Sequence, residues 1–550
     1  ASASKTVRSE ALETETSLPN FRQGDAIILY ERNSDTDNVT NKMVFKGNIE
    51  YLTENEIGIR LRATQQNPSV LPAESLYAIE HDTMDTTFRS MYQGLYIYLS
   101  ARKERRDLLL SQRPPRFDES LDSMISRSED DFTRIALKAK AAQDYFLLIG
   151  PPGTGKTSCA LKKMVETFHA DKDAQILLLS YTNRAVDEIC KSLASIAPAV
   201  DFIRVGSELS CDEAYRGHLI ENELSSCNRR SEVYERIRNC RIIVGTVAAI
   251  SGKPELFRLK HFDVAIIDEA TQILEPQLLG ILCARGEDGK DAIDKFVLIG
   301  DHKQLPAVVQ QNTEQSAIYD ESLLSIGLTN LKDSLFERLY RNCTATVHRS
   351  YDMLCRQGRM HPEVALFANR AFYGGRLIPV GLPHQIESSD TICRLAFYPS
   401  VPEKAGASAK INYSEARIVA DLAVRIYEDH QADFDESRTL GIITPYRSQI
   451  ALIKKEIESL GIPALNRILV DTVERFQGSE RDVIIYSFCV NYPYQLKFLS
   501  NLTEEEGVLI DRKLNVALTR ARKQMFITGV PELLERNPLY KSLLKLIESF

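Results

Sequence analysis

Residues 150–157 (GPPGTGKT) have the types and the spacing that suit the binding of a nucleoside triphosphate. They follow an aliphatic run, 145–149, and precede a helical pattern over 158–168. Glycines let backbone N–H groups turn inward around a β-phosphate, and a helix N-terminus adds partial positive charge. The Lys156 ammonium suits the β- and γ-phosphates, and the Thr157 hydroxyl can ligate Mg²⁺. The sequence therefore predicts a P-loop formed by Gly150, Pro151, Pro152, Gly153, Thr154, Gly155, Lys156, Thr157 and Ser158.

Two later segments place acidic and amide side chains after aliphatic runs. In 263–270 (DVAIIDEA) the run ends at Asp268 and Glu269, and in 300–306 (GDHKQLP) it is followed by Gln304. Asp268 is predicted to hold the magnesium through water, and Glu269 to act as general base for an attacking water. Gln304 can hydrogen-bond both that water and the γ-phosphate. Taken singly, a solvated acidic pair and a surface turn are the alternatives, but their order behind a P-loop argues against both.

Short aliphatic runs flanked by turn residues predict the parallel strands that must position these segments. A first series covers 145–149, 176–179, 242–244, 264–267 and 296–299. A second series covers 353–354, 441–443, 483–486 and 526–527. We therefore predict an α/β fold with two tandem doubly wound sheets, each with helices on both faces.

The predicted domains follow the chain in order. Residues 1–19 are polar and predicted to be a disordered lead-in. Short alternating stretches over 20–82 (26–30, 43–45, 48–52 and 57–61) predict a small accessory β-barrel. A helical stalk over 83–128 is expected to contain one long helix, 84–110, that ends before Pro114 and Pro115. The two sheet domains are assigned to 129–348, with a small helical insertion at about 206–240, and to 349–550.

Composition limits the classes of partner. Lys and Arg number 68 against 76 Asp and Glu, a net charge of −8, so a nucleic-acid site must be a local basic groove on an acidic body. The ten cysteines form no close C-x-x-C pair and are expected to be reduced thiols of a cytoplasmic protein. No apolar run reaches about 18 residues, so no membrane partner is predicted.

Eight motifs occur in the order seen in superfamily 1 helicases. They are GPPGTGKT, SYTNRAVDEI, DEATQ, GDHKQLP, RQGRMHP, TPYRSQ, VERFQGSERD and LNVALTRAR. The chain resembles the 5′-to-3′ branch that contains the nonsense-mediated-decay RNA helicase and, more closely, the helicase half of the eukaryotic replication nuclease-helicase. The resemblance covers roughly residues 20–545. It implies two RecA-like P-loop domains preceded by the barrel and stalk.

The resemblance also implies roles for residues of the second sheet. Arg359 and Arg520 should reach across the cleft to the γ-phosphate, where such arginines stabilise the charge on the transferring phosphoryl group. Glu480 is similar to the ribose-contacting acid of the family. Gln477 and Gly478 resemble the element that couples the nucleotide and polymer sites.

A single strand is expected to cross the tops of both sheets. The implied backbone contacts are Thr182, Asn183, Thr246, Thr444, Pro445 and Thr472. Small hydroxyl and amide groups suit a grip on phosphate and sugar that is blind to sequence. The alternative for each threonine at a strand end is a helix cap. The basic run over 102–106 could touch phosphates, although a solvated helix face is the alternative for such runs.

Two positions depart from the family pattern. The family commonly carries a Gln upstream of the P-loop that reads adenine, and this chain offers Arg134 in that stretch. The family often has an aromatic residue before the Arg of the RQGRMHP motif, and this chain has Gly358. Both departures predict a relaxed preference among nucleoside triphosphates.

The sequence thus predicts an ATP- and Mg²⁺-dependent helicase or translocase on single-stranded nucleic acid, with DNA favoured over RNA. The alternatives are an ATP-gated clamp on nucleic acid, an RNA-remodelling ATPase without strong unwinding, and a ring-forming P-loop ATPase. The ring enzyme takes its arginine from a neighbouring subunit, whereas Arg359 and Arg520 lie in the same chain, so a monomer is expected. Any nuclease would lie upstream in a longer parent, since the chain begins at Ala1 and carries no nuclease motif.

Overall fold

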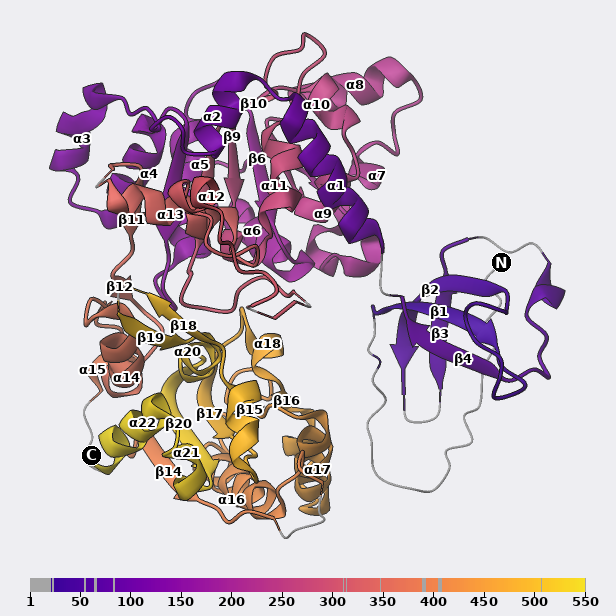
Figure 1. Cartoon of the computed structure of the whole chain (residues 1–550), viewed down its shortest axis with the longest axis vertical. Coiled ribbons are helices and arrows are strands. Elements are labelled where there is room, and N and C mark those ends of the chain that lie inside the picture. Colours follow the sequence, from indigo (N-terminus) through magenta and orange to yellow (C-terminus); the bar gives the residue numbers. More distant parts are fainter. Residues whose placement is uncertain are drawn as a thin grey trace. The chain divides into compact units, whose positions relative to one another are not determined.

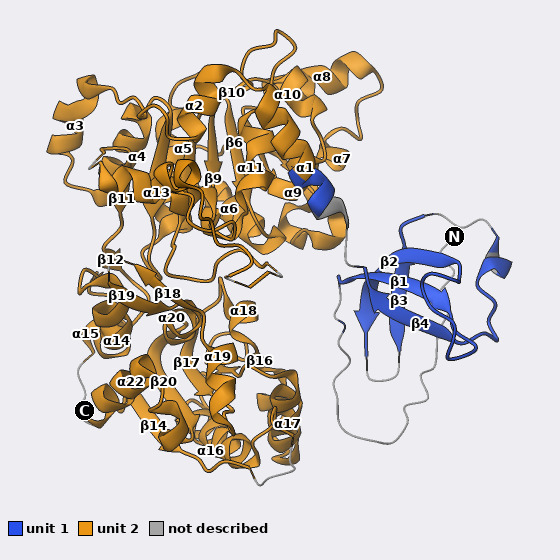
Figure 2. Cartoon of the chain, viewed as in Figure 1, with its two compact units in different colours: residues 1–91 blue, residues 92–550 orange. Residues whose placement is uncertain are grey.

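The computed structural model describes residues 21–549 except 22–23, 54–55, 64–66, 83–84, 310, 313, 347, 388–391, 404–407 and 506. The lead-in predicted at 1–19 lies outside the described residues. The chain divides into two compact units, 1–91 and 92–550, each of which is described by itself (Figure 2).

The first unit is built on an antiparallel sheet with the strand order β3-β2-β1-β4 (Figure 1). Its strands are β1 (Ala26–Glu31), β2 (Val44–Leu52), β3 (Ile57–Leu61) and β4 (Tyr77–His81), around a small core of Ile27, Leu29 and Ile49. The two runs predicted as separate strands, 43–45 and 48–52, form the single strand β2. Within the described residues no pairing joins β3 to β4, so closure into a barrel stays a prediction.

The prediction of one long helix over 84–110 is wrong, because two helices occupy this segment. Helix α1 (Asp85–Ser100) ends before Ala101, and α2 (Lys103–Leu109) starts after an extended Arg102. Ala101 is buried in the core, and the Arg105 guanidinium donates to the Asp294 carbonyl oxygen at 3.1 Å. These tertiary contacts redirect the chain where the sequence carries neither glycine nor proline.

The second unit holds a parallel sheet of seven strands, in the order β11-β5-β10-β9-β6-β8-β7. These strands are β5 (Tyr145–Ile149), β6 (Ile176–Ser180), β7 (Phe202–Val205), β8 (Ile242–Thr246), β9 (Phe262–Ile267), β10 (Ile293–Gly300) and β11 (Tyr351–Met353). Their side chains alternate between two cores, so Leu147 joins one and Leu148 the other. One face is covered by α4 (Asp131–Ala141), α5 (Lys162–His169) and α6 (Asn183–Ala194), and the other by α9 (Val247–Ser251), α11 (Glu275–Leu282) and α13 (Leu335–Ala345).

A second parallel sheet in the same unit has the order β14-β20-β17-β15-β16 (Figure 1). It comprises β14 (Leu395–Pro399), β15 (Leu440–Ile443), β16 (Leu469–Asp471), β17 (Arg481–Ser487) and β20 (Ala521–Gly529). Helices α14 (Pro362–Tyr373), α20 (Arg512–Leu518) and α22 (Pro538–Glu548) pack on one face, and α16 (Tyr413–Asp429) and α17 (Arg447–Ser459) on the other. Two parallel sheets, each covered on both faces, make the tandem RecA-like α/β fold that the sequence predicts.

Four strands of the two parallel sheets differ from the sequence-based assignment. The run 353–354 was assigned to the second sheet, but β11 pairs with β5 and completes the first sheet. Strands β7, β14 and β16 were not predicted, since they are short and sit at or near sheet edges. The segment expected as a helical insertion contains α7 (Ile220–Glu223) and α8 (Arg230–Asn239). No helix among the described residues is long and apolar enough to cross a membrane.

Candidate nucleotide site between the two sheets

The P-loop leaves the carboxyl end of β5 as a tight turn that only certain residues can form. The Gly150 N–H donates to the Gly300 carbonyl oxygen at 2.9 Å, which ties the loop to the end of β10. Gly153 and Gly155 have φ of 74° and 75°, a region where side chains with a Cβ are strained. The first helical turn is wide, since the Ala160 N–H bonds the Gly155 carbonyl five residues earlier. Backbone N–H groups of the loop are therefore presented at one edge of the sheet.

The acidic pair of β9 lies directly against the P-loop. The Lys156 Nζ is 2.8 Å from Oε1 of Glu269, and the Thr157 hydroxyl donates to Oδ2 of Asp268 at 2.5 Å. Burial, together with the neighbouring Glu269, raises the pKa of Asp268 to about 6. Burial alone would lower the pKa of Lys156, but the two carboxylates outweigh it and raise the pKa. The cation, hydroxyl and acids predicted from sequence thus share one buried site.

Glu269 is held in an unusual backbone conformation. Its φ is 54°, which is rare for a residue other than glycine and is typical of strained functional positions. The Gln272 amide donates to Oε2 of Glu269 at 2.9 Å, and the Glu269 N–H donates to Oδ1 of Asp268 at 2.9 Å. Burial would raise the pKa of Glu269, but Lys156 outweighs it and lowers the pKa. Glu269 is therefore an ionised carboxylate, as a general base must be.

Gln304 lies in a chain of hydrogen bonds that joins the two sheets. Its Nε2 donates to Oδ2 of Asp301 at 2.7 Å, and the Tyr373 hydroxyl donates to the same oxygen at 2.7 Å. The Asn515 amide donates to the Tyr373 hydroxyl oxygen at 2.8 Å. Sequence reasoning did not single out Tyr373 or Asn515. Asn515 at least belongs to a quoted motif, LNVALTRAR, whereas nothing in the sequence marks Tyr373.

Arg520 reaches the site from the second sheet. Only 2% of its surface is exposed, and its Nη2 donates to Oε1 of Gln304 at 3.3 Å. Its Nε donates to the Val516 carbonyl oxygen at 2.9 Å, which fixes the guanidinium. Burial and the nearby Arg359 lower the pKa of Arg520 to about 9. A bound anion such as a phosphate would counteract both effects and raise the pKa of Arg520.

Arg359 touches the P-loop itself. The Gly358 N–H donates to the Gly153 carbonyl oxygen at 2.8 Å, and a Cβ placed on Gly153 would lie 2.4 Å from that of Arg359. The Arg359 Nε donates to Oε2 of Glu480 at 2.5 Å. Glu480, expected at the ribose, therefore holds Arg359, and Oε1 of the same carboxylate lies 3.6 Å from Nε of Arg522. Both arginines predicted from sequence thus lie at the edge of the P-loop domain.

Two of the residues expected to contact nucleic acid cap helices. The Thr182 hydroxyl accepts from the Ala185 N–H at 3.2 Å at the start of α6, and Thr246 accepts from the Ala249 N–H at 3.1 Å at the start of α9. Asn183 is the first residue of α6. The capping role that competes with a ligand role is therefore present at Thr182 and Thr246.

The counterparts in the second sheet do not cap helices in this way. Thr444, which follows β15, is fully buried, and its hydroxyl has no hydrogen-bond partner within the described part of the chain. Pro445 is partly exposed, and no side chain caps α17. Thr472 precedes α18 (Val473–Phe476) without capping it, and Gln477 and Gly478 follow that helix directly.

The basic run of the stalk is largely satisfied within the protein. Lys103 Nζ donates to Asp107 at 2.9 Å, Arg106 donates to the Leu99 carbonyl at 3.2 Å, and Arg105 is buried. These contacts favour the alternative of a helix face over a phosphate contact for this run.

Arg134 is one of the two positions that depart from the family pattern. Its guanidinium lies 2.5 Å from the carboxylate of Asp131 on the same helix, α4.

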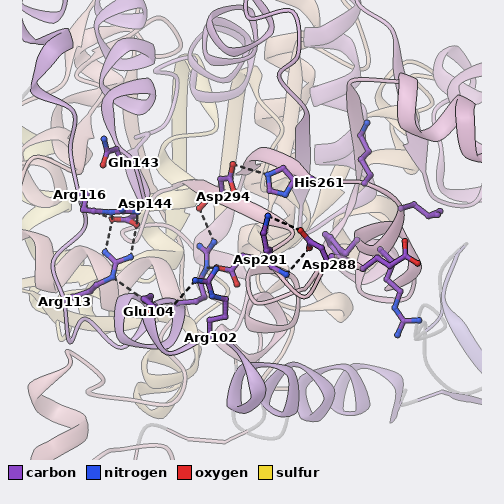
Figure 3. A pocket seen from close by; sticks show the side chains of 18 of the residues that line it. Arg102, Glu104, Arg113, Arg116, Gln143, Asp144, His261, Asp288, Asp291 and Asp294 are labelled. Carbon is purple, nitrogen blue, oxygen red and sulfur yellow. Dashed lines mark hydrogen bonds and ion pairs between the residues drawn. The ribbon is translucent and has the colours of Figure 1, made fainter.

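A cavity of about 1160 Å³ lies at the opposite, amino end of the first sheet (Figure 3). Its wall mixes basic and acidic side chains, several of which are paired with one another. Asp144 accepts from Arg113 Nη2 at 2.8 Å and from Arg116 Nη2 at 2.9 Å. The residues that line this cavity include none of those predicted for the nucleotide.

Comparison with known proteins agrees with this geometry. Two family models, both described as an AAA domain, match residues 127–233 with 220–312 and residues 331–532. The chain is 29% identical over 502 residues to the DNA replication ATP-dependent helicase/nuclease DNA2 of Gallus gallus, covering 87% of this chain and 45% of that protein. It is 28% identical over 540 residues to the Homo sapiens protein of the same name, covering 87% of this chain and 46% of that protein. The chain is therefore similar to ATP-dependent helicases of superfamily 1 over most of its length.

The chain spans about half the length of the curated relatives it matches. Among solved structures it resembles that of Arterivirus nonstructural protein 10 (helicase), with 12% identity and a TM-score of 0.37. That comparison covers 93% of this chain and 78% of the viral chain.

Proposed function

We propose that the chain hydrolyses ATP in the cleft between its two sheets and uses the energy to move along single-stranded nucleic acid, with DNA favoured over RNA. One observation carries the proposal. Arg520, directly before β20 of the second sheet, lies at Gln304 of the first sheet, and Arg359, shortly before the helix α14 that packs on the second sheet, lies at Gly153 within the same chain. The names of the relatives, which are ATP-dependent helicase/nucleases of DNA replication, support the choice of substrate.

The contacts in the cleft suggest how the residues exchange partners when a triphosphate binds. Lys156 would leave Glu269 for the phosphates, which frees Glu269 to take a proton from the attacking water. Gln304 would orient that water, and the two arginines would stabilise charge on the transferring phosphoryl group. Thr157 and Asp268, already in contact, would hold Mg²⁺, which supplies positive charge beside the phosphates.

Movement would follow from opening and closing of the same cleft. Because Arg520, Gln304, Asp301 and Tyr373 form a continuous chain of contacts, a change at the phosphate shifts one sheet against the other. The strand is proposed to lie on Thr182, Asn183, Thr246, Thr444, Pro445 and Thr472. The Thr444 hydroxyl is buried and has no hydrogen-bond partner among the described residues, which supports this path, since such a group is costly unless the loop opens to bind a ligand. The likeness to the 5′-to-3′ branch favours that direction.

The test is ATP hydrolysis measured with no polymer, with single-stranded DNA and with single-stranded RNA, side by side. We expect strong stimulation by DNA and weaker stimulation by RNA. Equal rates in all three mixtures would contradict a motor. Strong hydrolysis with RNA alone would move the substrate to RNA.

A second function, an ATP-gated clamp, is supported by the fact that all the interactions above serve closure as well as movement. A strand-displacement assay separates the two, because a clamp binds without displacing. We further propose a monomer, Mg²⁺ as the metal, a cytoplasmic location and a nuclease domain in a longer parent chain. Sedimentation of an active enzyme as a monomer distinguishes it from a ring-forming ATPase.

A further inference from the structure

The loops that follow β15 and β17 emerge side by side at one edge of the second sheet. The two strands are parallel neighbours, with Ile443 opposite Tyr486. The chain after β15 carries Thr444 and Pro445, which the proposed function places on the strand. The chain after β17 continues into a turn, 493–495, and the short helix α19 (Leu496–Leu499), labelled in Figure 2. Whatever lies along the first loop therefore passes close to the second.

A buried amide fixes the second loop to the first. The Gln495 side chain accepts from the N–H groups of Asn491 and Tyr492, each at 2.9 Å, through one oxygen. Its nitrogen donates to the Tyr446 hydroxyl oxygen at 3.1 Å and to the Ala409 carbonyl oxygen at 2.8 Å. Because Gln495 is buried and saturated in this way, the loop has a fixed shape rather than a mobile one.

This fixed loop presents aromatic rings to solvent. Tyr494 is 54% exposed and Phe498 is 70% exposed, while the Tyr492 ring stacks on Tyr494 with centroids 5.7 Å apart and planes 14° apart. Leu496 and Leu499 anchor the other side of α19 in the core. Rings held outward on a rigid support lose little freedom when they bind a flat partner, which favours stacking.

We propose that Tyr494 and Phe498, with Tyr492 behind Tyr494 and Lys497 between them in sequence, form a platform on which bases of the bound single strand stack. The inference rests on the proposed function, because it extends the path over Thr444 and Pro445. Stacking on aromatic rings is tolerant of sequence, since every base has a flat π-face. The exposed Lys497 adds positive charge beside the rings, which suits the phosphates that accompany the bases.

Two other occupants fit less well. A second copy of the chain would be expected to bury a wider apolar surface than the few side chains that protrude here. A lone exposed ring needs no partner at all, but a stacked pair beside a third ring, on a loop fixed by a buried amide, is a built feature. The platform also continues the loop that contains Thr444, and this continuity favours nucleic acid.

The experiment uses the 550-residue chain and two fluorescein-labelled strands of about 20 nucleotides, long enough to cross both sheets. One strand is oligothymidylate, and the other has the same backbone with abasic sites. Affinity is measured by anisotropy for wild type, Tyr494→Ala, Phe498→Ala and Tyr494→Phe. The matched control is Tyr319→Ala, which removes an even more exposed ring, 82% exposed, from the segment that follows β10 of the first sheet.

We expect Tyr494→Ala and Phe498→Ala each to weaken binding of oligothymidylate about 10-fold, while affinity for the abasic strand does not change. Tyr494→Phe and Tyr319→Ala should bind both strands as wild type does. Hydrolysis without polymer should be unaffected in every variant, because none of these residues touches the cleft.

Three outcomes would overturn the platform. They are wild-type affinity of the alanine variants for oligothymidylate, an equal loss on both strands, and a change in sedimentation that shows the rings to be a contact between copies. If wild type binds neither strand, the proposed function fails and the platform fails with it. If wild type binds but the variants match it, the platform alone fails.

Discussion

The nucleotide cleft and the amino end of the first sheet are both clusters of buried charge, yet they are built differently. At the amino end, two arginines of the segment after α2 converge on one carboxylate, Asp144, and all three residues belong to the domain of the first sheet. In the cleft, Lys156 and Glu269 belong to the domain of the first sheet, while Arg359 and Arg520 belong to the domain of the second. Under the proposed function, the first cluster stays intact throughout a cycle, whereas the second exchanges partners.

The pKa directions reflect this difference. Burial would raise the pKa of Asp144, but hydrogen bonds from Arg113 and Arg116 hold it well below its usual value. Arg520 shows the reverse, since burial and Arg359 lower its pKa to about 9 without a matching carboxylate in full contact. A charge that is compensated in the resting protein stabilises the fold, whereas one left under-compensated favours an incoming anion.

The largest effect is expected for Arg520→Ala, which tests whether the cleft depends on a charge from the second sheet. Arg520→Lys is the variant that keeps the charge. We expect the turnover number with saturating ATP and DNA to fall by about 10³-fold or more, because the variant loses charge stabilisation of the phosphoryl group. Thermal unfolding should change little in the lysine variant.

Arg522→Ala serves as the matched control. This side chain lies two positions away and pairs with Asp482 at 3.2 Å; it also approaches Glu480 at 3.6 Å, but it lies outside the chain of contacts to Gln304. We expect it to retain most of the activity. Similar losses in Arg520→Ala and Arg522→Ala would mean that the start of β20, rather than the Arg520 guanidinium, is what matters.

The second largest effect is expected for Glu269→Gln. The amide keeps the shape of the side chain but cannot take a proton, so turnover should fall by about 10²- to 10⁴-fold. Binding of a fluorescent ATP analogue should persist, because removal of one carboxylate leaves Lys156 free for the phosphates. Normal turnover in this variant would remove Glu269 from the role of base.

The sequence was sufficient to predict which side chains come together when each of them follows one strand of the first sheet. Lys156, Asp268 and Gln304 follow aliphatic runs, and parallel strands bring their carboxyl ends to one edge. It was insufficient where a side chain acts through a partner distant in sequence. Tyr373 is the last residue of an ordinary amphipathic helix, and only folding places its hydroxyl on Asp301.

The same limit explains the errors in the elements. Strand β11 sits just before the RQGRMHP motif, and its sequence cannot show that it pairs with β5 rather than with a strand of the second sheet. The break between α1 and α2 arises from burial of Ala101 and Arg105 against the first sheet. Local propensity favours one continuous helix there, and tertiary contacts override it.

Asp144→Asn tests the other side of the comparison. Removing the carboxylate leaves two arginines without their shared partner, so the free energy of unfolding should fall by about 3 kcal/mol, less if solvent screens the exposed Arg116. The turnover of ATP by the folded variant should match wild type. A loss of turnover without a loss of stability would show that the amino end communicates with the cleft.

The loss of stability in Asp144→Asn should depend on pH with a definite sign. The pKa of Asp144 is lowered in the folded protein, so its contribution is present above the unfolded pKa, about 3.9, and is lost as pH falls below it. The difference in denaturation midpoint between wild type and Asp144→Asn should therefore be full at pH 7 and shrink towards pH 3. A constant difference across this range would exclude the ion pairs as its source.

The smallest expected effect concerns Arg134, which lies near the cleft but is paired like the residues of the amino end. Phe132 of the same helix packs on the P-loop, 3.5 Å from the position of a Cβ on Gly155, so α4 borders the nucleotide. Because Arg134 pairs with Asp131, it offers no adenine-specific amide, and we expect kcat/KM for ATP, GTP and CTP to agree within about 10-fold.

Arg134→Gln supplies the missing amide and should raise the preference for ATP by about 10-fold, since a hydrogen-bonding edge discriminates between bases. Arg134→Lys keeps the charge beside Asp131 and should leave the preference as it is. A strict requirement for ATP in wild type would show that another residue reads the base. The pairing of Arg134 would then be structural, and Arg134 would belong with Asp144 rather than with the cleft.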